Sequence, residues 1–405
     1  MTAAEPVWLI DGVRTPFGRF GGSLRDVRLP DLGAHVVRTM LDRAPGAADV
    51  VDELNVGIAM IEGGMMVPAR QIQFAAGLPE TLPTLTVDRA CCSGLTAAAL
   101  GVRAIRSGAR ATIGLGIESM SRTPRLLHET RWGMRRGDLE IEDVLMLRSP
   151  LSGTAIANYA GHEALARGID RAMQDRWAVQ SHERWFAARD AGWFDDEVVP
   201  IDVESGRFTY DEQPREGTTV ERLAQLPTVY DSPTVTAGNA PGLNDGACAL
   251  LLGDASAVEA AGRRPLARII AYVQVAGSAT SAVYLPGKAI RHLVEEAGLE
   301  VSDLDVVEIN EAYAATALAS ARELAGGDPG LEDELHAKTN VHGGAVAIGH
   351  PTGASGARIL LTAARALQHQ GGRWAAVAIC GGIGPNNAAL LGAARRIRPL
   401  APLWG

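Results

Sequence analysis

The sequence His350-Pro351-Thr352-Gly353 stands at the start of an Ala-rich helical segment that extends to Leu367. A strand-like apolar run follows, from Trp374 to Cys380. Glycine and proline mark the turn before the helix, and helical and strand-like segments that alternate in this way are typical of α/β proteins. This part of the chain is therefore expected to form an α/β unit.

The same order of elements occurs in the first third of the chain. Cys91-Cys92-Ser93-Gly94 precedes an Ala-rich helical segment that ends near Arg106, and the strand-like run from Ala111 to Gly116 comes next. Two segments with the same order of turn, helix and strand indicate two halves built on one plan. Such halves would bring their equivalent turns together about a pseudo-twofold axis.

Other strand-like and helical segments alternate throughout both halves. The expected strands include Leu54 to Ala59 and Val306 to Ile309, and the expected helices include Asp31 to Arg43, Lys288 to Ala297 and Ala354 to His369. Residues 122–245 differ, because they contain proline, tryptophan and clusters of charge. We predict that they form an insertion over one face of a core made of residues 1–121 with 246–266 and residues 267–405.

Composition limits the classes of partner. The chain of 405 residues has 47% hydrophobic and 21% charged residues, which is an ordinary globular mixture. A net charge of −9 argues against a nucleic-acid partner. No apolar run has the length of a membrane span, and no signal peptide is recognised. Four irregularly spaced cysteines fit a reducing compartment, so we expect a cytoplasmic protein with no membrane partner.

Cys91 is a candidate nucleophile because it lies at the turn before a helix. The free backbone N–H groups and the positive end of that helix would lower the pKa of the thiol. A buried structural cysteine is the simpler alternative. The neighbouring Cys92 is expected to point elsewhere and to act as a small packing residue.

Three further residues could complete a catalytic site. His350 lies in the Gly-rich stretch from Gly343 to Gly356, and a Cys–His pair is a common nucleophile and base. Cys380 ends a strand and precedes glycines whose backbone N–H groups could stabilise an oxyanion. Asn310 also follows a strand, at the place where α/β proteins bind ligands. Taken alone, each residue could equally be structural.

Together these residues resemble the thiolase family nearly from end to end. Four family motifs occur in the family's order, with a further match from Gly238 to Ala247: Cys91-Cys92-Ser93-Gly94, Asn310-Glu311-Ala312, Gly349-His350-Pro351 and Cys380-Gly381-Gly382-Ile383-Gly384. The resemblance implies a duplicated α-β-α-β-α five-layered sandwich with an inserted loop domain. It also implies an acyltransferase that uses coenzyme A and acyl-CoA, with no metal and no tightly bound cofactor.

The resemblance assigns a role to each site residue. His350 would accept the proton of Cys91, which becomes acylated, and Cys380 would move the α-proton of the second acyl-CoA. One oxyanion site would use His350 with a water held by Asn310, and the other would use the backbone of Cys91 and Gly382. The substrate would also contact the residues Ala237, Gly238, Ala312 and Tyr313.

Several positions depart from the family pattern. The stretch from Leu151 to Asn158 replaces a His-Met-Gly and Thr-Ala-Glu region, and the segment before it looks shortened. The stretch from Thr280 to Leu285 replaces a Gly-Pro segment. Both would lie near the acyl group, where Val283, Tyr284 and Leu285 would supply apolar surface. Three single residues also differ, and these are Pro241, His342 and Ile383.

Two other classes of function remain open on the sequence alone. A ketosynthase-type condensing enzyme shares the duplicated fold but relies on Cys-His-His, which does not fit Asn310 and Cys380. A non-catalytic thiolase-like subunit would have little reason to retain all four site residues. The family forms twofold dimers, and many members pair dimers through the loop domain. Because that domain looks shortened, we expect a homodimer rather than a homotetramer.

Overall fold

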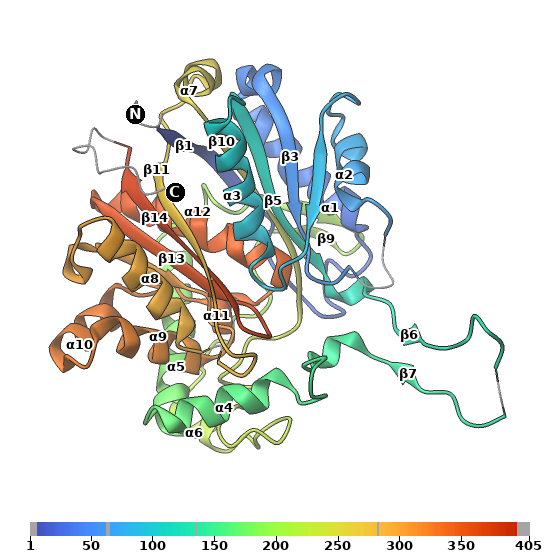
Figure 1. Ribbon diagram of the computed structural model, residues 1–405, viewed down its shortest axis with the longest axis vertical. Helices are drawn as coiled ribbons and strands as arrows, with labels where there is room; N and C mark the ends of the chain where they lie inside the picture. The colour runs from blue at the N-terminus through green and yellow to red at the C-terminus, as the bar shows by residue number, and fades with distance from the viewer. Residues whose placement is uncertain (1–5, 62–64, 135, 282, 395–405) are drawn as a thin grey trace.

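The computed structural model describes residues 6–61, 65–134, 136–281 and 283–394. The chain forms a large mixed sheet made of two halves. Helices cover the outer faces of the sheet and lie between its two halves, and an insertion lies at one side (Figure 1). Among the helices in these ranges, none combines the length and the apolar character that crossing a bilayer requires.

The first half of the sheet contains the strands of the N-terminal unit. β3 pairs in parallel with β4 and β5, and β5, β10 and β1 then pair antiparallel in that order. β10 also pairs with the short β2. The strands are β1 (Val7–Arg14), β2 (Gly18–Arg19), β3 (Val51–Gly57), β4 (Thr84–Val87), β5 (Ala111–Ser119) and β10 (Asn244–Gly253).

The second half of the sheet repeats this pairing. β12 pairs in parallel with β13, and β13, β14 and β11 pair antiparallel in that order. These strands are β11 (Ala267–Ala276), β12 (Val306–Ile309), β13 (Trp374–Cys380) and β14 (Pro385–Ala393). The two halves meet at one end, where three residues of β1 pair with β11. The repeated order of elements in the sequence is thus a repeated sheet topology.

Two helices lie between the half-sheets: α3 (Ser93–Arg106) and α12 (Thr352–Gln370). α12 contacts strands of both halves as well as α3. A Cβ at Gly94 would meet the Gly353 carbonyl oxygen at 2.5 Å, and one at Gly356 would meet the Leu95 nitrogen at 2.6 Å. The two helix starts therefore touch backbone to backbone, which only glycine permits.

The remaining helices of the two halves cover the outer faces of the sheet. Those on the N-terminal side are α1 (Leu29–Asp42), α2 (Pro68–Ala76) and α7 (Ala255–Ala261). Those on the C-terminal side are α8 (Leu285–Glu296), α9 (Ala314–Ala325) and α10 (Pro329–Lys338), with the short α11 (Ala345–Ile348) beside the insertion. Helix, sheet, helix, sheet and helix form five layers, as the family resemblance implies.

The insertion contains short elements and one long helix. They are β6 (Leu126–Leu127), β7 (Ile141–Glu142), α4 (Ile156–Ala166), α5 (Arg171–Asp190), β8 (Ile201–Val203), β9 (Gly206–Phe208) and α6 (Val220–Ala224). The β6–β7 hairpin projects away from the body, and α4, α5 and α6 lie together at the base of the molecule (Figure 1).

A buried ion network joins the insertion to the core. The Arg14 guanidinium, at the end of β1, donates from Nε to Glu197 at 2.6 Å and from Nη1 to Asp211 at 2.6 Å. The Arg14 and Glu197 side chains are fully buried and Asp211 is nearly so. Because a buried charge is costly without its partners, loss of any of these residues would destabilise the attachment of the insertion.

Short 3₁₀ turns supplement these elements: η1 (Pro45–Val50), η2 (Met120–Arg122), η3 (Val144–Met146) and η4 (Val301–Asp303). Most of the helix and strand boundaries expected from the sequence lie within a few residues of the observed ones. β3 begins earlier and ends earlier than expected, because its pairing with β5 starts at Val51. α8 begins at Leu285 and not at Lys288, since Pro286 is well suited to a first helical turn.

Candidate active site

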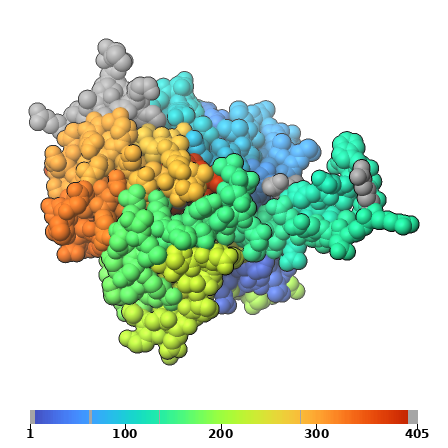
Figure 2. Space-filling view, turned by 60° about the horizontal axis from the view of Figure 1, so that its bottom comes forward, coloured from blue at the N-terminus to red at the C-terminus, as the bar shows by residue number. Residues whose placement is uncertain are grey.

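One deep cavity of about 650 Å³ holds the three main candidate residues, Cys91, His350 and Cys380. Its walls come from the N-terminal half, the C-terminal half and the insertion. In Figure 2, atoms from the C-terminal part of the chain, in red, are visible in a recess bordered by the green insertion. The insertion therefore forms part of the entrance to the cavity.

The turn before α3 presents Cys91 in a fixed position. The backbone at Ala90 has a φ of 48°, a left-handed conformation that is uncommon for alanine. Asp88 Oδ1 accepts a hydrogen bond from Ala90 N at 2.8 Å, and Ser93 Oγ donates to Ala90 O at 2.6 Å. Strained backbone of this kind persists where surrounding contacts hold it, and it clusters at functional sites.

The environment of Cys91 changes the expected acidity of its thiol. Burial raises the pKa of the Cys91 thiol well above its ordinary value, and the nearby Cys380 and Glu118 raise it further. The expectation of a lowered pKa was therefore wrong. α3 begins at Ser93, so Cys91 precedes the helix, and desolvation outweighs the attraction of the helix end. The thiol is neutral before a base removes its proton.

Cys92 packs away from the cavity, as expected. It is fully buried, and its Sγ lies 3.3 Å from the Ile379 carbonyl oxygen. Burial raises the pKa of this thiol as well. Cys92 is therefore a packing residue between α3 and β13.

His350 is held by contacts on both sides of its ring. Its backbone N–H donates to Asn244 Oδ1 at 2.9 Å, and Nδ1 lies 2.7 Å from Ser355 Oγ. On the other side, Asn310 Nδ2 donates to Nε2 at 3.4 Å. Burial lowers the pKa of His350 to about 3, with Arg358 contributing in the same direction. The ring is therefore neutral at pH 7, and its Nε2 lone pair can accept a proton, although as a weaker base than a free histidine.

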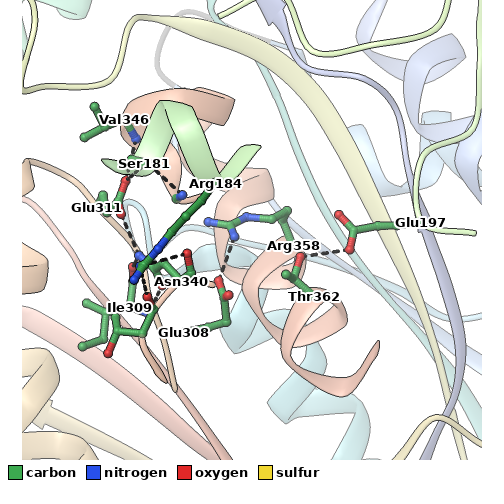
Figure 3. A network of polar contacts seen from close by, with 12 residues as sticks. Ser181, Arg184, Glu197, Glu308, Ile309, Glu311, Asn340, Val346, Arg358 and Thr362 are labelled. Carbon is green, nitrogen blue, oxygen red and sulfur yellow. Dashed lines mark hydrogen bonds and ion pairs between the residues drawn. The ribbon is translucent and has the colours of Figure 1, made fainter. Parts of the chain in front are cut away.

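Glu311 fixes the loop that carries Asn310, and the sequence alone did not identify this role. Its carboxylate is fully buried and accepts four hydrogen bonds, several of which Figure 3 shows. The donors are Trp177 Nε1 at 2.9 Å, Ser181 Oγ at 3.0 Å, Asn340 Nδ2 at 2.8 Å and Val346 N at 2.9 Å. Two of them come from α5, so the insertion also supports the site from behind.

Glu118, at the end of β5, is a second residue that the sequence did not point to. It accepts hydrogen bonds from Thr352 Oγ1 at 2.6 Å and Gly353 N at 3.0 Å, at the start of α12. A carboxylate suits the positive end of a helix. Burial raises the pKa of Glu118, although these hydrogen bonds oppose the shift. The contact ties the His350 turn to the N-terminal half.

Cys380 ends β13 and is almost fully buried at the base of the cavity. Burial raises the pKa of its thiol to about 12. The loop after it turns back on itself, because Gly381 N donates to Pro385 O at 2.7 Å. Gly382 lines the cavity, and its Cβ position is open apart from Ile156 at 3.7 Å.

Three of the four residues that were expected to contact the substrate lie at the cavity. Ala237, Ala312 and Tyr313 line the cavity. Gly238 does not, and a Cβ there would meet Leu223 at 2.6 Å and Leu226 at 2.7 Å. The expectation for Gly238 was wrong, because this glycine lets its loop pack against α6 and faces away from the cavity.

The departures from the family pattern lie only partly at the cavity. Ile156, Ala157 and Val283 line it, whereas Leu151 is 73% exposed outside it. Tyr284 and Leu285 do not line it, contrary to expectation. The Arg167 guanidinium lies 3.5 Å from the Tyr284 ring centre, and Leu285 is buried at the start of α8. Ala282 lies outside the described residues.

The three single substitutions fall in different places. Pro241 and Ile383 line the cavity. His342 lies elsewhere, with its ring stacked on Trp193 at a centroid distance of 3.7 Å. Within the part of the chain that the structure describes, no group of three or more His, Cys, Asp or Glu side chains could hold a metal ion.

Comparison with known proteins extends this picture over the whole chain. Residues 7–256 match the thiolase N-terminal domain, and residues 263–393 match the thiolase C-terminal domain. A probable acetyl-CoA acetyltransferase of Mycolicibacterium smegmatis is 39% identical, over 95% of this chain and 99% of the relative. A beta-ketoadipyl-CoA thiolase of Pseudomonas aeruginosa is also 39% identical, over 94% of this chain and 97% of the relative.

Solved structures of a thiolase are also similar to this chain. Human mitochondrial 3-ketoacyl-CoA thiolase has a TM-score of 0.91 at 35% identity, covering 97% of this chain and 100% of that one. Its complex with CoA also has a TM-score of 0.91 at 35% identity, covering 97% and 99%. Both domain matches, the full-length relatives and the shared fold lead to one conclusion: the chain belongs to the thiolase family.

Proposed function

We propose that the protein catalyses the reversible CoA-dependent condensation of acyl-CoA, or the thiolytic cleavage of a 3-ketoacyl-CoA, through an acyl-enzyme on Cys91. The observation that carries this proposal is the presence of Cys91, His350 and Cys380 in one cavity of a thiolase-family chain. Names of relatives that act on CoA thioesters, and the CoA complex of a similar structure, support acyl-CoA and CoA as ligands.

In the first step, His350 Nε2 takes the proton of the Cys91 thiol as sulfur attacks the thioester carbonyl. The bond between the carbonyl carbon and the CoA sulfur then breaks, and the same proton leaves with the CoA thiolate. Because burial raises the pKa of the thiol, a base in contact with it is needed for this attack. The backbone N–H groups of Cys91 and Gly382 would stabilise the oxyanion.

In the second step, Cys380 as thiolate removes the α-proton of a second acyl-CoA. The resulting carbanion attacks the acyl carbon on Cys91, the new carbon–carbon bond forms and the Cys91 thiolate is released. This thiolate takes the proton that Cys380 removed, so Cys91 returns to the thiol and Cys380 to the thiolate. The thioester oxygen of the second acyl-CoA gains negative charge, which a water held by Asn310 would stabilise, together with His350 in the tautomer that carries its proton on Nε2. The cycle needs CoA thioesters and neither a metal nor a redox cofactor.

The alternative functions have less support. A ketosynthase-type site needs a second histidine, whereas Asn310 is the residue beside His350. A non-catalytic subunit would not need the strained backbone at Ala90 that presents the nucleophile. In the proposed enzyme, residues 122–245 serve as the loop domain that covers the active site between halves 1–121 with 246–266 and 267–405.

We expect an acyl chain longer or bulkier than acetoacetyl. Ile156 and Val283 give apolar walls, and Ala157, a small residue, also lines the cavity. Each additional buried methylene contributes about 0.8 kcal/mol, or about fourfold in kcat/KM. In thiolysis assays, medium-chain, branched or cyclic 3-ketoacyl-CoAs should therefore exceed acetoacetyl-CoA in kcat/KM.

The matched variants for this test are Ala157→Leu, which narrows the cavity, and Leu151→Ala, which removes an exposed side chain outside it. Ala157→Leu should move the optimum toward acetoacetyl-CoA, and Leu151→Ala should leave it in place. A maximum at acetoacetyl-CoA in the wild-type protein would show that the pocket argument is wrong. Absence of thiolysis across the whole panel would count against the proposed function itself.

We propose a homodimer as the basic assembly. β4 is the last strand of its half-sheet, so its outer edge has backbone groups free to pair with another chain. Dimers could pair into a homotetramer through the β6–β7 hairpin. That hairpin extends from the body and exposes Trp132 and Ile141, at 90% and 62%. These exposed side chains favour the tetramer over the dimer expected from the shortened loop domain.

The double variant Trp132→Glu with Ile141→Glu should lower the molar mass in multi-angle light scattering from that of a tetramer to that of a dimer. Charged side chains placed in an apolar contact between dimers would oppose its burial. Phe20→Glu, at an exposed apolar residue of the N-terminal half outside the hairpin strands, serves as the control and should leave the mass unchanged. A wild-type mass of one chain would refute both assemblies.

A further inference from the structure

Asn386 is a buried polar residue of β14 that lies directly beside Cys380. The two residues are opposite each other in the antiparallel pair of β13 and β14. Residues in such opposite positions project from the same face of a sheet, with their Cβ atoms about 4.5 to 5.5 Å apart. The Asn386 carboxamide is therefore a neighbour of the thiol that the proposed function uses as a base.

Within the part of the chain that the structure describes, the carboxamide of Asn386 has no hydrogen-bond partner. The side chain is 0% exposed, and neither its Oδ1 nor its Nδ2 makes a hydrogen bond. The opposite residue on the other neighbouring strand is Val275, and the next pair on the same face is Ala378 with Ala388. Of these neighbours in the sheet, only Cys380 has a side chain that can accept a hydrogen bond.

The charge on the Cys380 sulfur decides how well it can accept one. A neutral thiol is a weak acceptor, whereas hydrogen bonds to an ionised group are short and strong. Burial raises the pKa of the Cys380 thiol to about 12, and the Glu163 carboxylate adds to this shift. Because the second step of the proposed function uses the thiolate, a donor beside the sulfur would favour the form that this step needs.

We propose that Asn386 is a positioning residue whose Nδ2 donates a hydrogen bond to the Cys380 thiolate and thereby stabilises the base of the second step. This inference rests on the proposed function. Across a Cβ separation of this size, rotation about χ1 and χ2 of Asn386 brings the amide to the sulfur. Acylation of Cys91 depends on His350 and not on Cys380, so the proposal predicts an effect on the second step alone.

The test compares Asn386→Val with Asn386→Thr. The two variants have nearly the same shape, and only threonine carries a hydroxyl that can donate to the sulfur. Both residues are β-branched and suit a strand. The matched control is Asn55→Val, because Asn55 of β3 is also fully buried, has no hydrogen bond to its carboxamide and does not line the cavity.

Alkylation of Cys380 by iodoacetamide gives the first readout and requires no acyl-CoA. It is followed between pH 7 and pH 9 by mass spectrometry of the peptide that contains Cys380, in a Cys91→Ser background. Asn386→Val should lower the rate by about 10- to 100-fold, the size expected for loss of one hydrogen bond to a charged group. Asn386→Thr should stay within about fivefold of the parent protein, and Asn55→Val should leave the rate unchanged.

The two half-reactions give the second readout, with Cys91 in place and acetyl-CoA as substrate. Asn386→Val should lower kcat for α-proton exchange in deuterated water by about 10- to 100-fold, with KM changed by less than threefold. Release of CoA in a single turnover should stay within about threefold of wild type. Asn386→Thr should restore exchange to within about fivefold of wild type.

Equal losses in Asn386→Val and Asn386→Thr would overturn the proposal, because shape and not the donor would then be decisive. Wild-type rates of alkylation and exchange in Asn386→Val would overturn it as well, and so would an equal loss in Asn55→Val. Failure of the proposed function has a different signature. The wild-type protein would then release no CoA and exchange no α-proton, while alkylation of Cys380 would still differ between Asn386→Val and Asn386→Thr.

Discussion

Cys91→Ser is expected to abolish acyl transfer while the fold remains intact. A hydroxyl has a far higher pKa than a thiol, and desolvation of the side chain at residue 91 disfavours the anion further. Loss of a catalytic nucleophile lowers turnover by orders of magnitude, so we expect a decrease of more than about 10⁴-fold in kcat. The side chain is nearly isosteric, so the melting temperature should stay close to that of wild type.

Mass spectrometry after incubation with acyl-CoA checks this directly. The acyl mass should appear on the peptide that contains Cys91 in the wild-type protein and should be absent in Cys91→Ser. Cys248→Ala is the control, because Cys248 is a buried thiol in β10 that does not line the cavity. Acyl label only on Cys92 or Cys248 would require a different nucleophile.

The reactivity of Cys91 toward an alkylating reagent should depend on pH. A raised thiol pKa means that the anion is scarce at neutral pH and grows with each pH unit up to that pKa. Alkylation of Cys91 by iodoacetamide, without substrate, should therefore rise continuously from pH 6 to pH 9. A plateau already at pH 7 would show that the thiolate is stabilised in the folded protein.

Cys380→Ala should separate the two half-reactions. Acylation of Cys91 depends on His350 and should continue, within about tenfold of wild type. The variant has no thiol at position 380 to remove the α-proton of the second acyl-CoA. The rates of α-proton exchange and condensation should therefore fall by about 10²- to 10⁴-fold. Cys380 is almost fully buried, and its replacement by a smaller residue should cost only modest stability.

Single-turnover CoA release and proton exchange in deuterated water measure the two steps independently. Ile383→Ala, three positions further on in the glycine-containing loop and also at the cavity, controls for altered shape of this wall. Condensation near the wild-type rate in Cys380→Ala would assign the base to another residue and leave Cys380 with a packing role.

Much of the fold and the main residues of the site could be predicted because they are local in the sequence. A turn, an Ala-rich helix and an apolar strand each have a signal within about twenty residues, and their repetition indicates the duplicated sheet. The motifs of Cys91, His350 and Cys380 lie at the ends of such elements. Topology brings these ends together, and the family resemblance supplies their roles.

The supporting contacts could not be predicted in the same way. Glu311 is held by Trp177 and Ser181, which lie 134 and 130 residues away on an insertion helix that carries no motif. The pKa of Cys91 was misjudged for a related reason. The helix end is a local feature of the sequence, whereas burial depends on walls contributed by three parts of the chain.

Some residues were also assigned to the cavity although they face a different part of the protein. Gly238 was assigned to the substrate because of its motif, yet the leucines of α6 and the following turn occupy that side. Leu285 was assigned to the acyl pocket, yet it opens α8 and is buried there. A sequence motif gives the position of the backbone, and the direction of each side chain depends on packing partners that come from elsewhere.

The contact between α3 and α12 has a consequence for synthesis on the ribosome. α3 emerges early, but the helix that covers it is α12, which is followed by β13 and β14 at the end of the described chain. Until then, the apolar faces of α3 and of the first half-sheet lack their final cover. Such a surface is prone to aggregation in a nascent chain. The first half-sheet therefore gains its final cover only when translation is almost complete, and Cys91 and His350 come together only at that moment.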